Sequence, residues 1–205
     1  MDQNPLYNMG LVYPDLYRDQ FKRFVIAYKN TGFNPLRSVT PFYMGIKQHV
    51  KRDEVFHADP IFINAENHLQ TLFDEYKISL VLPRIWFVKH VLVELLIDRN
   101  LVKRFPDKAN AMHQDFEQVL KEHKSTFTRV LSTYEHQIFF NRLAKISQDK
   151  HIFAYLNNQT LIRTLFSIYN KVGIVIDAKT ERIAAQRLEQ IIQKTDNQTW
   201  LTWQI

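Results

Sequence analysis

Three side chains that can bind a metal ion or transfer a proton follow one another at four-residue intervals, at His49, Asp53 and His57. On an α-helix, which turns by about 100° per residue, positions four apart lie on the same face. Apolar residues share that face, at Phe42, Ile46 and Phe56. The spacing therefore predicts that the three polar groups face the core of the protein.

A second pair of such groups, His90 and Glu94, stands one helical turn apart in the segment 85–102, which is apolar almost all round. Burying an unpaired carboxylate is costly, so such a group is usually hydrogen-bonded or bound to a metal ion. If this segment packs against the segment 40–57, imidazole and carboxylate groups converge. Mixed nitrogen and oxygen ligands without sulfur suit manganese, iron or zinc, and several carboxylates can bridge two ions in phosphoester hydrolysis.

A structural role for the same groups is the alternative, because a single buried histidine–glutamate pair is more often a hydrogen bond than a pair of ligands. In that case His49, Asp53, His90 and Glu94 form a buried polar network. The protein is then a non-catalytic helical interaction module. The residue pattern leaves both interpretations open.

The elements that must position these groups are predicted to be helices. Glycine occurs only 4 times in 205 residues, well below its ordinary share of about 7%. Proline stands where several periodic segments begin, preceded by the candidate N-caps Thr40 and Asp59. We expect helices at about 14–30, 40–57, 60–77, 83–102, 106–124, 125–146, 158–171 and 180–194. The pattern favours an all-α fold with one compact domain, residues 1–205, a loop or a short strand at 172–177 and a docked tail at 200–205.

The net charge of +6 indicates an acidic partner, which charge alone does not identify. Nucleic acid ranks last, because the chain has no recognised motif and no dense cluster of Lys and Arg with interleaved aromatic residues. No apolar run approaches the ~18 residues of a membrane span, and the first residues do not resemble a secretion signal. The absence of cysteine fits a reducing compartment, so we expect a cytoplasmic protein.

Three blocks of the chain carry a resemblance to a known family. Residues 10–15 (GLVYPD) match an early G-N-x-x-x-D segment, residues 45–53 (GIKQHVKRD) match G-I-x-x-H-R-x-I-D, and residues 151–171 match a W-L-x-x-Y helix-turn-helix. Together they resemble the acyl carrier protein phosphodiesterases, which are regarded as distant relatives of the HD metal hydrolases. Residues 10–15 fit equally well a G-x-x-x-P-D segment of zinc-dependent phospholipases.

The resemblance implies an HD-like helical bundle that hydrolyses a phosphodiester, releasing the phosphopantetheine arm from a serine of acyl carrier protein. The favoured ion is Mn²⁺, with iron or zinc as alternatives. The expected metal ligands are Asp15, His49, Asp53, His57, His90 and Glu94. Asp53 and His57 are also the candidate catalytic groups, with His57 as general acid. Lys47, Lys51 and Arg52 are the expected contacts to the acidic carrier protein.

The chain departs from the family pattern at several positions. The N-terminal N-F-L-A-H segment is absent, and His57 stands where the family has Asp. In the segment 83–102 the family has Asp and then Asp-His four residues later, whereas this chain has His90 and then Glu94-Leu95. His90 and Glu94 can still bind a metal ion at these two positions. These exchanges predict a metal site of altered geometry, or a relative with a different substrate.

Overall fold

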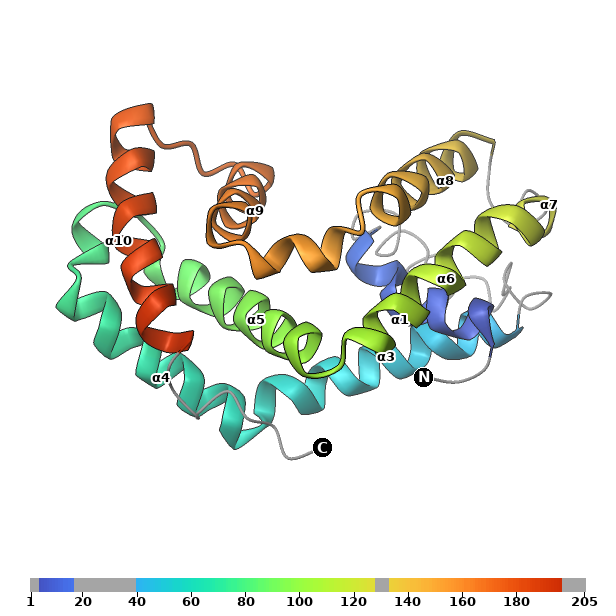
Figure 1. Ribbon diagram of the computed structural model, residues 1–205, viewed down its shortest axis with the longest axis horizontal. Helices are drawn as coiled ribbons and strands as arrows, with labels where there is room; N and C mark the ends of the chain where they lie inside the picture. The colour runs from blue at the N-terminus through green and yellow to red at the C-terminus, as the bar shows by residue number, and fades with distance from the viewer. Residues whose placement is uncertain (1–3, 17–39, 128–132, 197–205) are drawn as a thin grey trace, which may run out of the picture. The chain divides into compact units, whose positions relative to one another are not determined.

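The computed structural model describes residues 4–16, 40–127 and 133–196, and every regular element in these ranges is a helix (Figure 1). The all-α prediction is therefore confirmed. The α-helices are α1 (Pro5–Leu16), α3 (Thr40–Ala58), α4 (Pro60–Glu75), α5 (Ile85–Arg104), α6 (Pro106–Glu122), α7 (Lys124–Phe127), α8 (Thr133–Gln148), α9 (Asn158–Lys171) and α10 (Ala178–Asp196). Two short 3₁₀ helices are η2 (Ile78–Leu80) and η3 (His151–Leu156). None of the described helices combines the length and the apolar character that crossing a membrane requires.

The chain divides into two compact units, each built from two separate stretches of sequence. Unit 1 comprises Met1–Val55 and Asp107–His151, and unit 2 comprises Phe56–Pro106 and Ile152–Ile205. Most of α3 belongs to unit 1, while its last residues, from Phe56 onward, belong to unit 2. That the chain behaves as one domain over residues 1–205 stays a prediction.

Unit 2 is organised around α5, whose residues from Val88 to Val102 are all buried or partly buried. It packs against α4 and α9, and α9 packs in turn against α10. The Tyr169 hydroxyl on α9 donates to the Pro83 carbonyl just before α5, and the Tyr169 ring stacks on Phe87. Burial raises the pKa of this phenol to about 12. The core of unit 2 therefore fixes the orientation of α5 on several sides.

Helix starts in unit 2 follow from side chains that cap free backbone N–H groups. Asp59 accepts a hydrogen bond from the N–H of Ile61 at 2.8 Å, with Pro60 in the first turn, so its predicted role as N-cap is confirmed. Asn157 caps α9 in the same way, through the N–H of Thr160. The predicted helix at 158–171 is confirmed with the same bounds.

Unit 1 brings α1 and α3 into close contact at two of the chain's few glycines, Gly10 and Gly45. A Cβ atom on Gly10 would clash with the carbonyl oxygen of Phe42, and one on Gly45 would clash with that of Tyr7. The absence of a side chain at both positions therefore allows the two backbones to touch. This contact places the end of α1 beside the middle of α3.

The prediction that a helix begins at Pro14 is wrong, because Pro14 lies inside the last turns of α1. The helix begins instead at Pro5, where the Asn4 side chain accepts hydrogen bonds from the N–H groups of Leu6 and Tyr7. This Asn-Pro pair is the same start signal as Asp59-Pro60. The rest of the predicted 14–30 helix and the tail at 200–205 lie outside the described residues.

The remaining predictions differ from the structure mainly at helix ends. The helix expected from Pro83 begins at Ile85, because Arg84 adopts a left-handed conformation with φ of 50°. In the region of the predicted 125–146 helix the structure describes α7 and α8. η3 and α9 lie in residues 151–171, where the resemblance implies a helix-turn-helix. Residues 172–177 form a loop rather than a short strand, with Gly173 at a φ of 77°.

Candidate metal centre

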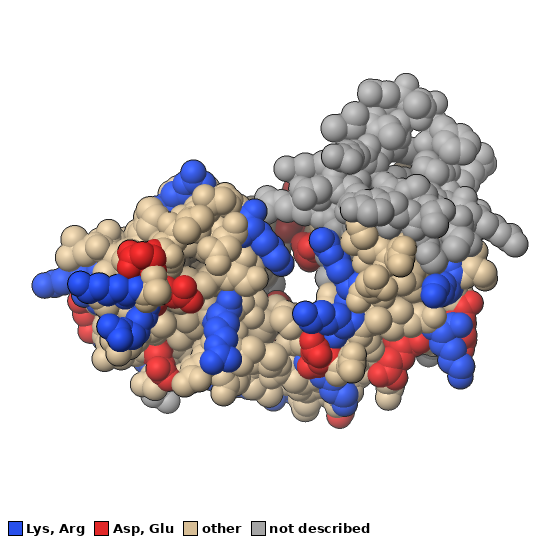
Figure 2. Space-filling model, turned by 90° about the horizontal axis from the view of Figure 1, so that it is seen from above, with Lys and Arg blue, Asp and Glu red and all other residues tan. Residues whose placement is uncertain are grey.

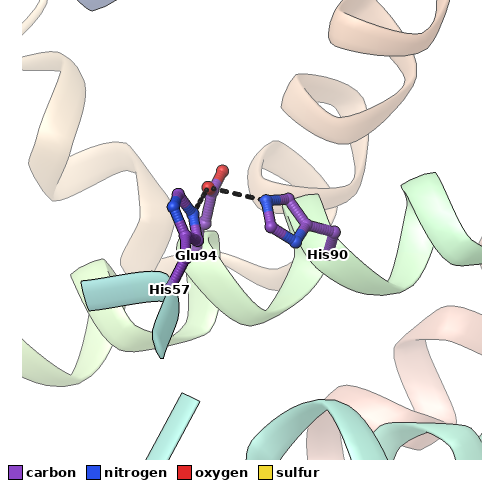
Figure 3. A group of neighbouring side chains, drawn as sticks. All are labelled: His57, His90 and Glu94. Carbon is purple, nitrogen blue, oxygen red and sulfur yellow. Dashed lines mark hydrogen bonds and ion pairs between the residues drawn. The ribbon is translucent and has the colours of Figure 1, made fainter. Parts of the chain in front are cut away.

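Three of the predicted ligands, His57, His90 and Glu94, converge in unit 2 (Figure 3). Each contributes one ligand atom, and these atoms all lie within 4.8 Å of one another. His90 and Glu94 are one turn apart on α5, whereas His57 comes from the last turn of α3. Within the described residues, this is the group of His, Asp and Glu side chains with the spacing of a metal site.

A single carboxylate oxygen joins the two imidazoles. Oε1 of Glu94 lies 3.0 Å from Nε2 of His57 and 3.4 Å from Nε2 of His90. Ligand atoms about 2.1 Å from one ion lie about 3.0 Å apart at octahedral angles and about 3.4 Å apart at tetrahedral angles. The two contacts of Glu94 Oε1 therefore have the spacing of neighbouring ligands around one ion.

Aromatic packing holds the two imidazole rings in place. The rings of His57 and His90 stack with centroids 4.7 Å apart and planes inclined by 25°. Phe62 of α4, which is fully buried, meets both rings edge-on, at 4.9 Å from His57 and 5.1 Å from His90. The apolar core thus extends directly beneath the polar cluster and restricts the orientations of both rings.

The sequence predicted that these groups are buried in the core, but in the structure the cluster is only half-buried. The side chains of His57, His90 and Glu94 are 29%, 36% and 38% exposed. The hydrogen bond with Glu94 raises the pKa of His90 above its ordinary value, against the opposing effect of burial. Burial acts to raise the pKa of Glu94, but the hydrogen bonds from His90 and His57 outweigh it, and the pKa is lowered. The three groups are therefore paired and also accessible to a small ligand from solvent.

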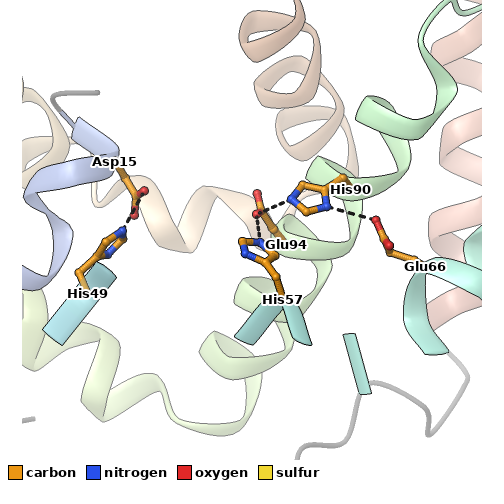
Figure 4. A network of polar contacts seen from close by, with 6 residues as sticks. All are labelled: Asp15, His49, His57, Glu66, His90 and Glu94. Carbon is orange, nitrogen blue, oxygen red and sulfur yellow. Dashed lines mark hydrogen bonds and ion pairs between the residues drawn. The ribbon is translucent and has the colours of Figure 1, made fainter. Parts of the chain in front are cut away.

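Sequence reasoning missed one member of the network, Glu66 of α4. Its Oε1 lies 3.2 Å from Nδ1 of His90, the ring nitrogen that faces away from Glu94 (Figure 4). Glu66 follows Phe62 by four residues and precedes Leu69 by three, so it lies on the apolar face of α4. A carboxylate on an apolar helix face was the signal used for Glu94, and the same signal identifies Glu66.

Two other predicted ligands, His49 and Asp15, contact each other in unit 1 at the crossing of α3 and α1 (Figure 4). Nδ1–H of His49 donates to the carbonyl oxygen of Leu11 at 2.7 Å, and its Nε2 lies 3.8 Å from Oδ1 of Asp15. The His49 side chain is largely covered, while that of Asp15 is exposed. These two residues form a pair, without a third ligand among the described side chains at metal-site spacing.

Asp53 differs from its predicted environment, because it is exposed rather than core-facing. The predicted face of α3 is buried at Phe42 and Ile46, but all residues of 51–55 are exposed. This stretch lies between the part of α3 in the unit 1 core and Phe56, which packs on the unit 2 core. A helical wheel cannot detect such a change, since it treats one face as uniform along the whole helix.

The predicted partner contacts, Lys47, Lys51 and Arg52, are exposed as expected.

Comparison of the chain with protein-family models, with curated proteins and with solved structures finds no match. The resemblance to the acyl carrier protein phosphodiesterases therefore stays a prediction based on its three sequence blocks. The site must be interpreted from its own geometry.

Proposed function

We propose that this protein is a metal-dependent hydrolase with one divalent ion held by His57, His90 and Glu94. The observation that carries the proposal is the position of Glu94 Oε1, at 3.0 Å and 3.4 Å from the Nε2 atoms of the two imidazoles. Two histidines and one carboxylate are a recurrent ligand set for zinc and for non-haem iron, and they leave further coordination positions for water and substrate.

The hydrogen-bonding capacity of His90 supports a cation rather than a purely structural network. Both of its ring nitrogens face carboxylate oxygens, those of Glu94 and Glu66, so the ring lies between two acidic groups. A divalent ion at Nε2 would require a neutral ring, which could still donate from Nδ1 to Glu66. The site is therefore already arranged for positive charge at the position where an ion would bind.

A divalent ion at this site would supply Lewis acidity toward a phosphoryl or carbonyl oxygen. The partial exposure of the three ligands would allow a substrate to reach it. We propose Mn²⁺ as the resident ion, because the resemblance to the acyl carrier protein phosphodiesterases implies it. Iron and zinc are the alternatives, since all three suit a ligand set of nitrogen and oxygen without sulfur. His57 then serves as a ligand, which argues against its predicted role as general acid.

The proposed substrate is a phosphodiester carried by an acidic protein such as acyl carrier protein. The proposal is supported by the net charge of +6 and by the exposure of Lys47, Lys51 and Arg52 on α3. On the face drawn in Figure 2, Lys and Arg side chains are spread over the surface with Asp and Glu among them. On this face the positive charge is dispersed, which fits an acidic protein better than the dense basic surface that nucleic acid requires.

The test is metal content and hydrolysis in the wild type, in His90→Ala and in the control His123→Ala, which changes a histidine outside the cluster. Each protein is stripped with a chelator, reloaded with Mn²⁺, Fe²⁺ or Zn²⁺, and assayed by elemental analysis. Activity is measured on bis-p-nitrophenyl phosphate and on holo-acyl carrier protein. We expect one ion per chain and metal-dependent turnover in the wild type and in His123→Ala, and neither in His90→Ala.

A folded wild-type protein that retains no ion and hydrolyses neither substrate would overturn the hydrolase proposal. Binding of acyl carrier protein without turnover would instead identify a non-catalytic interaction module. In that module the hydrogen bonds among His57, His90, Glu94 and Glu66 are a structural network.

A further inference from the structure

We infer that Glu66 is a positioning residue that orients His90 so that its Nε2 atom faces the metal ion. The inference rests on the proposed metal centre and adds a residue that belongs to neither the predicted ligands nor the cluster at metal-site spacing. It assigns to α4 a direct part in the site, although none of the three ligands comes from that helix.

The geometry separates Glu66 from the ligands themselves. Its Oε1 lies 3.2 Å from Nδ1 of His90, whereas Glu94 lies 3.4 Å from Nε2 of the same ring. The two nitrogens of an imidazole point away from each other, as the contacts on either side of His90 in Figure 4 illustrate. An ion held by Nε2 and Glu94 is therefore out of reach of Glu66, which acts instead on the ligand.

A carboxylate on the second ring nitrogen has a defined effect on a metal-binding histidine. It accepts the Nδ1–H hydrogen bond, which fixes the tautomer that leaves Nε2 free to bind the ion. Its negative charge also makes the imidazole a more basic ligand. Both effects act through His90 and require no contact between Glu66 and the ion.

The packing of α4 against α5 makes this contact a consequence of the fold. Phe62, one turn before Glu66, meets the His90 ring edge-on at 5.1 Å. One helix thus supplies both the apolar surface that supports the ring and the acceptor that sets its rotation. The side chain of Glu66 is only 25% exposed, whereas Glu75 on the same helix is half exposed and pairs with Lys194.

The contrast with Glu75 provides a matched control, because the two glutamates share a helix and each pairs with a basic group. An exposed ion pair such as Glu75–Lys194 contributes little to stability and has no route to the metal. If Glu66 were only another such pair, removing its charge would leave the metal-binding properties of the protein unchanged.

The experiment compares Co²⁺ binding to the wild type, Glu66→Ala, Glu66→Gln and Glu75→Gln, each in the full chain. Affinity is measured by competition with a chromophoric chelator, and the visible d–d absorption reports the geometry around the ion. We expect Glu66→Ala to weaken affinity by about 10–100-fold, as loss of an outer hydrogen-bond partner does, and to change the d–d spectrum. Glu66→Gln keeps an acceptor for Nδ1–H without the charge, so we expect a smaller loss and a spectrum close to wild type. Glu75→Gln should match the wild type.

Circular dichroism of each variant separates loss of metal binding from loss of folding, and the nearly isosteric Glu66→Gln keeps the comparison informative if Glu66→Ala unfolds. Wild-type affinity and spectrum in folded Glu66→Ala would overturn the role of Glu66 and leave the metal centre intact. If Glu66→Ala does not fold, wild-type affinity in Glu66→Gln would overturn it. Absence of Co²⁺ binding by the wild type would overturn the metal centre itself, together with the role that rests on it.

Discussion

His57 Nε2 lies 3.0 Å from Glu94 Oε1, and this contact joins the last turn of α3 to the middle of α5 across 37 residues of sequence. The other ligand contact, between His90 and Glu94, lies within one turn of α5, and residues four apart are neighbours in any α-helix. The third ligand is therefore the one that depends on tertiary structure. His57 is placed beside Glu94 by the packing of Phe56 against Phe62, whose ring centroids lie 4.9 Å apart at the junction of α3 and α4.

Glu94→Gln should separate metal binding from the hydrogen bonds of the cluster. The amide oxygen can still accept a hydrogen bond from His57 or His90, so we expect the variant to fold. A neutral amide is a much weaker ligand than a carboxylate, so metal affinity should fall by more than the about 10–100-fold that loss of an outer partner costs. Isothermal titration with Mn²⁺ and Zn²⁺ measures the change. Affinity equal to that of the wild type would remove Glu94 from the ligand set.

The stability of the metal-free protein should depend on pH through His90 and Glu94. The raised pKa of His90 contributes stability that is present below its ordinary value of 6.5 and is lost as pH rises through the folded-state pKa. The lowered pKa of Glu94 contributes stability that is present above its ordinary value of 4.5 and is lost as pH falls through the folded-state pKa. Both contributions are therefore present between pH 4.5 and 6.5.

The size of this effect is limited by solvent, because both side chains are more than a third exposed. We expect about 1 kcal/mol or less in the free energy of unfolding. Urea unfolding of chelator-treated protein at a series of pH values measures this effect. Glu94→Gln serves as the control, in which the free energy of unfolding should show a smaller maximum between pH 4.5 and 6.5. An identical pH profile in the variant would show that the His90–Glu94 contact contributes nothing to folding.

Much of the fold could be predicted from sequence because its signals are local. The Asp59-Pro60 pair starts α4, and the bounds of α9 follow from its periodic pattern. Pro14 was misread because proline also occurs within helices, and the capping contacts of Asn4 show where α1 begins. A sequence rule that weighs each X-Pro pair for a capping side chain would have chosen Asn4-Pro5 over Tyr13-Pro14.

The candidate site could be predicted only in part, because its members depend on different levels of structure. His90 and Glu94 follow from an apolar helix that carries two polar groups one turn apart. Asp53 was placed with them by helical periodicity, yet its stretch of α3 is exposed. Glu66 lies on the apolar face of its helix, but its contact with His90 depends on how α4 packs on α5, which the sequence pattern does not give.

Gly10→Ala and Gly45→Ala should both destabilise unit 1. In an ordinary helix the change from glycine to alanine stabilises by about 1 kcal/mol, but here the added Cβ would clash with the carbonyl oxygen of Phe42 or of Tyr7. Forcing the helices apart should cost about 1–3 kcal/mol in the free energy of unfolding. Met44→Ala, at an exposed position of α3, is the control. Thermal unfolding that leaves either glycine variant as stable as the wild type would contradict the close crossing of α1 and α3.

A buried ion pair in unit 2 provides the last prediction. The Arg99 guanidinium of α5, which is almost fully buried, donates to Asp196 Oδ2 at 2.7 Å and to Asn158 Oδ1 at 2.6 Å. Asp196→Ala would leave this cation without its carboxylate, so we expect a loss of about 3 kcal/mol in the free energy of unfolding.

Lys103 contacts the same carboxylate at 3.0 Å but is exposed, which makes Lys103→Ala a matched control. The control should cost less than about 1 kcal/mol, because water can solvate the partner that remains. Urea unfolding of both variants gives the comparison. Equal losses would show that burial of Arg99 does not make its ion pair more important for stability than the exposed one.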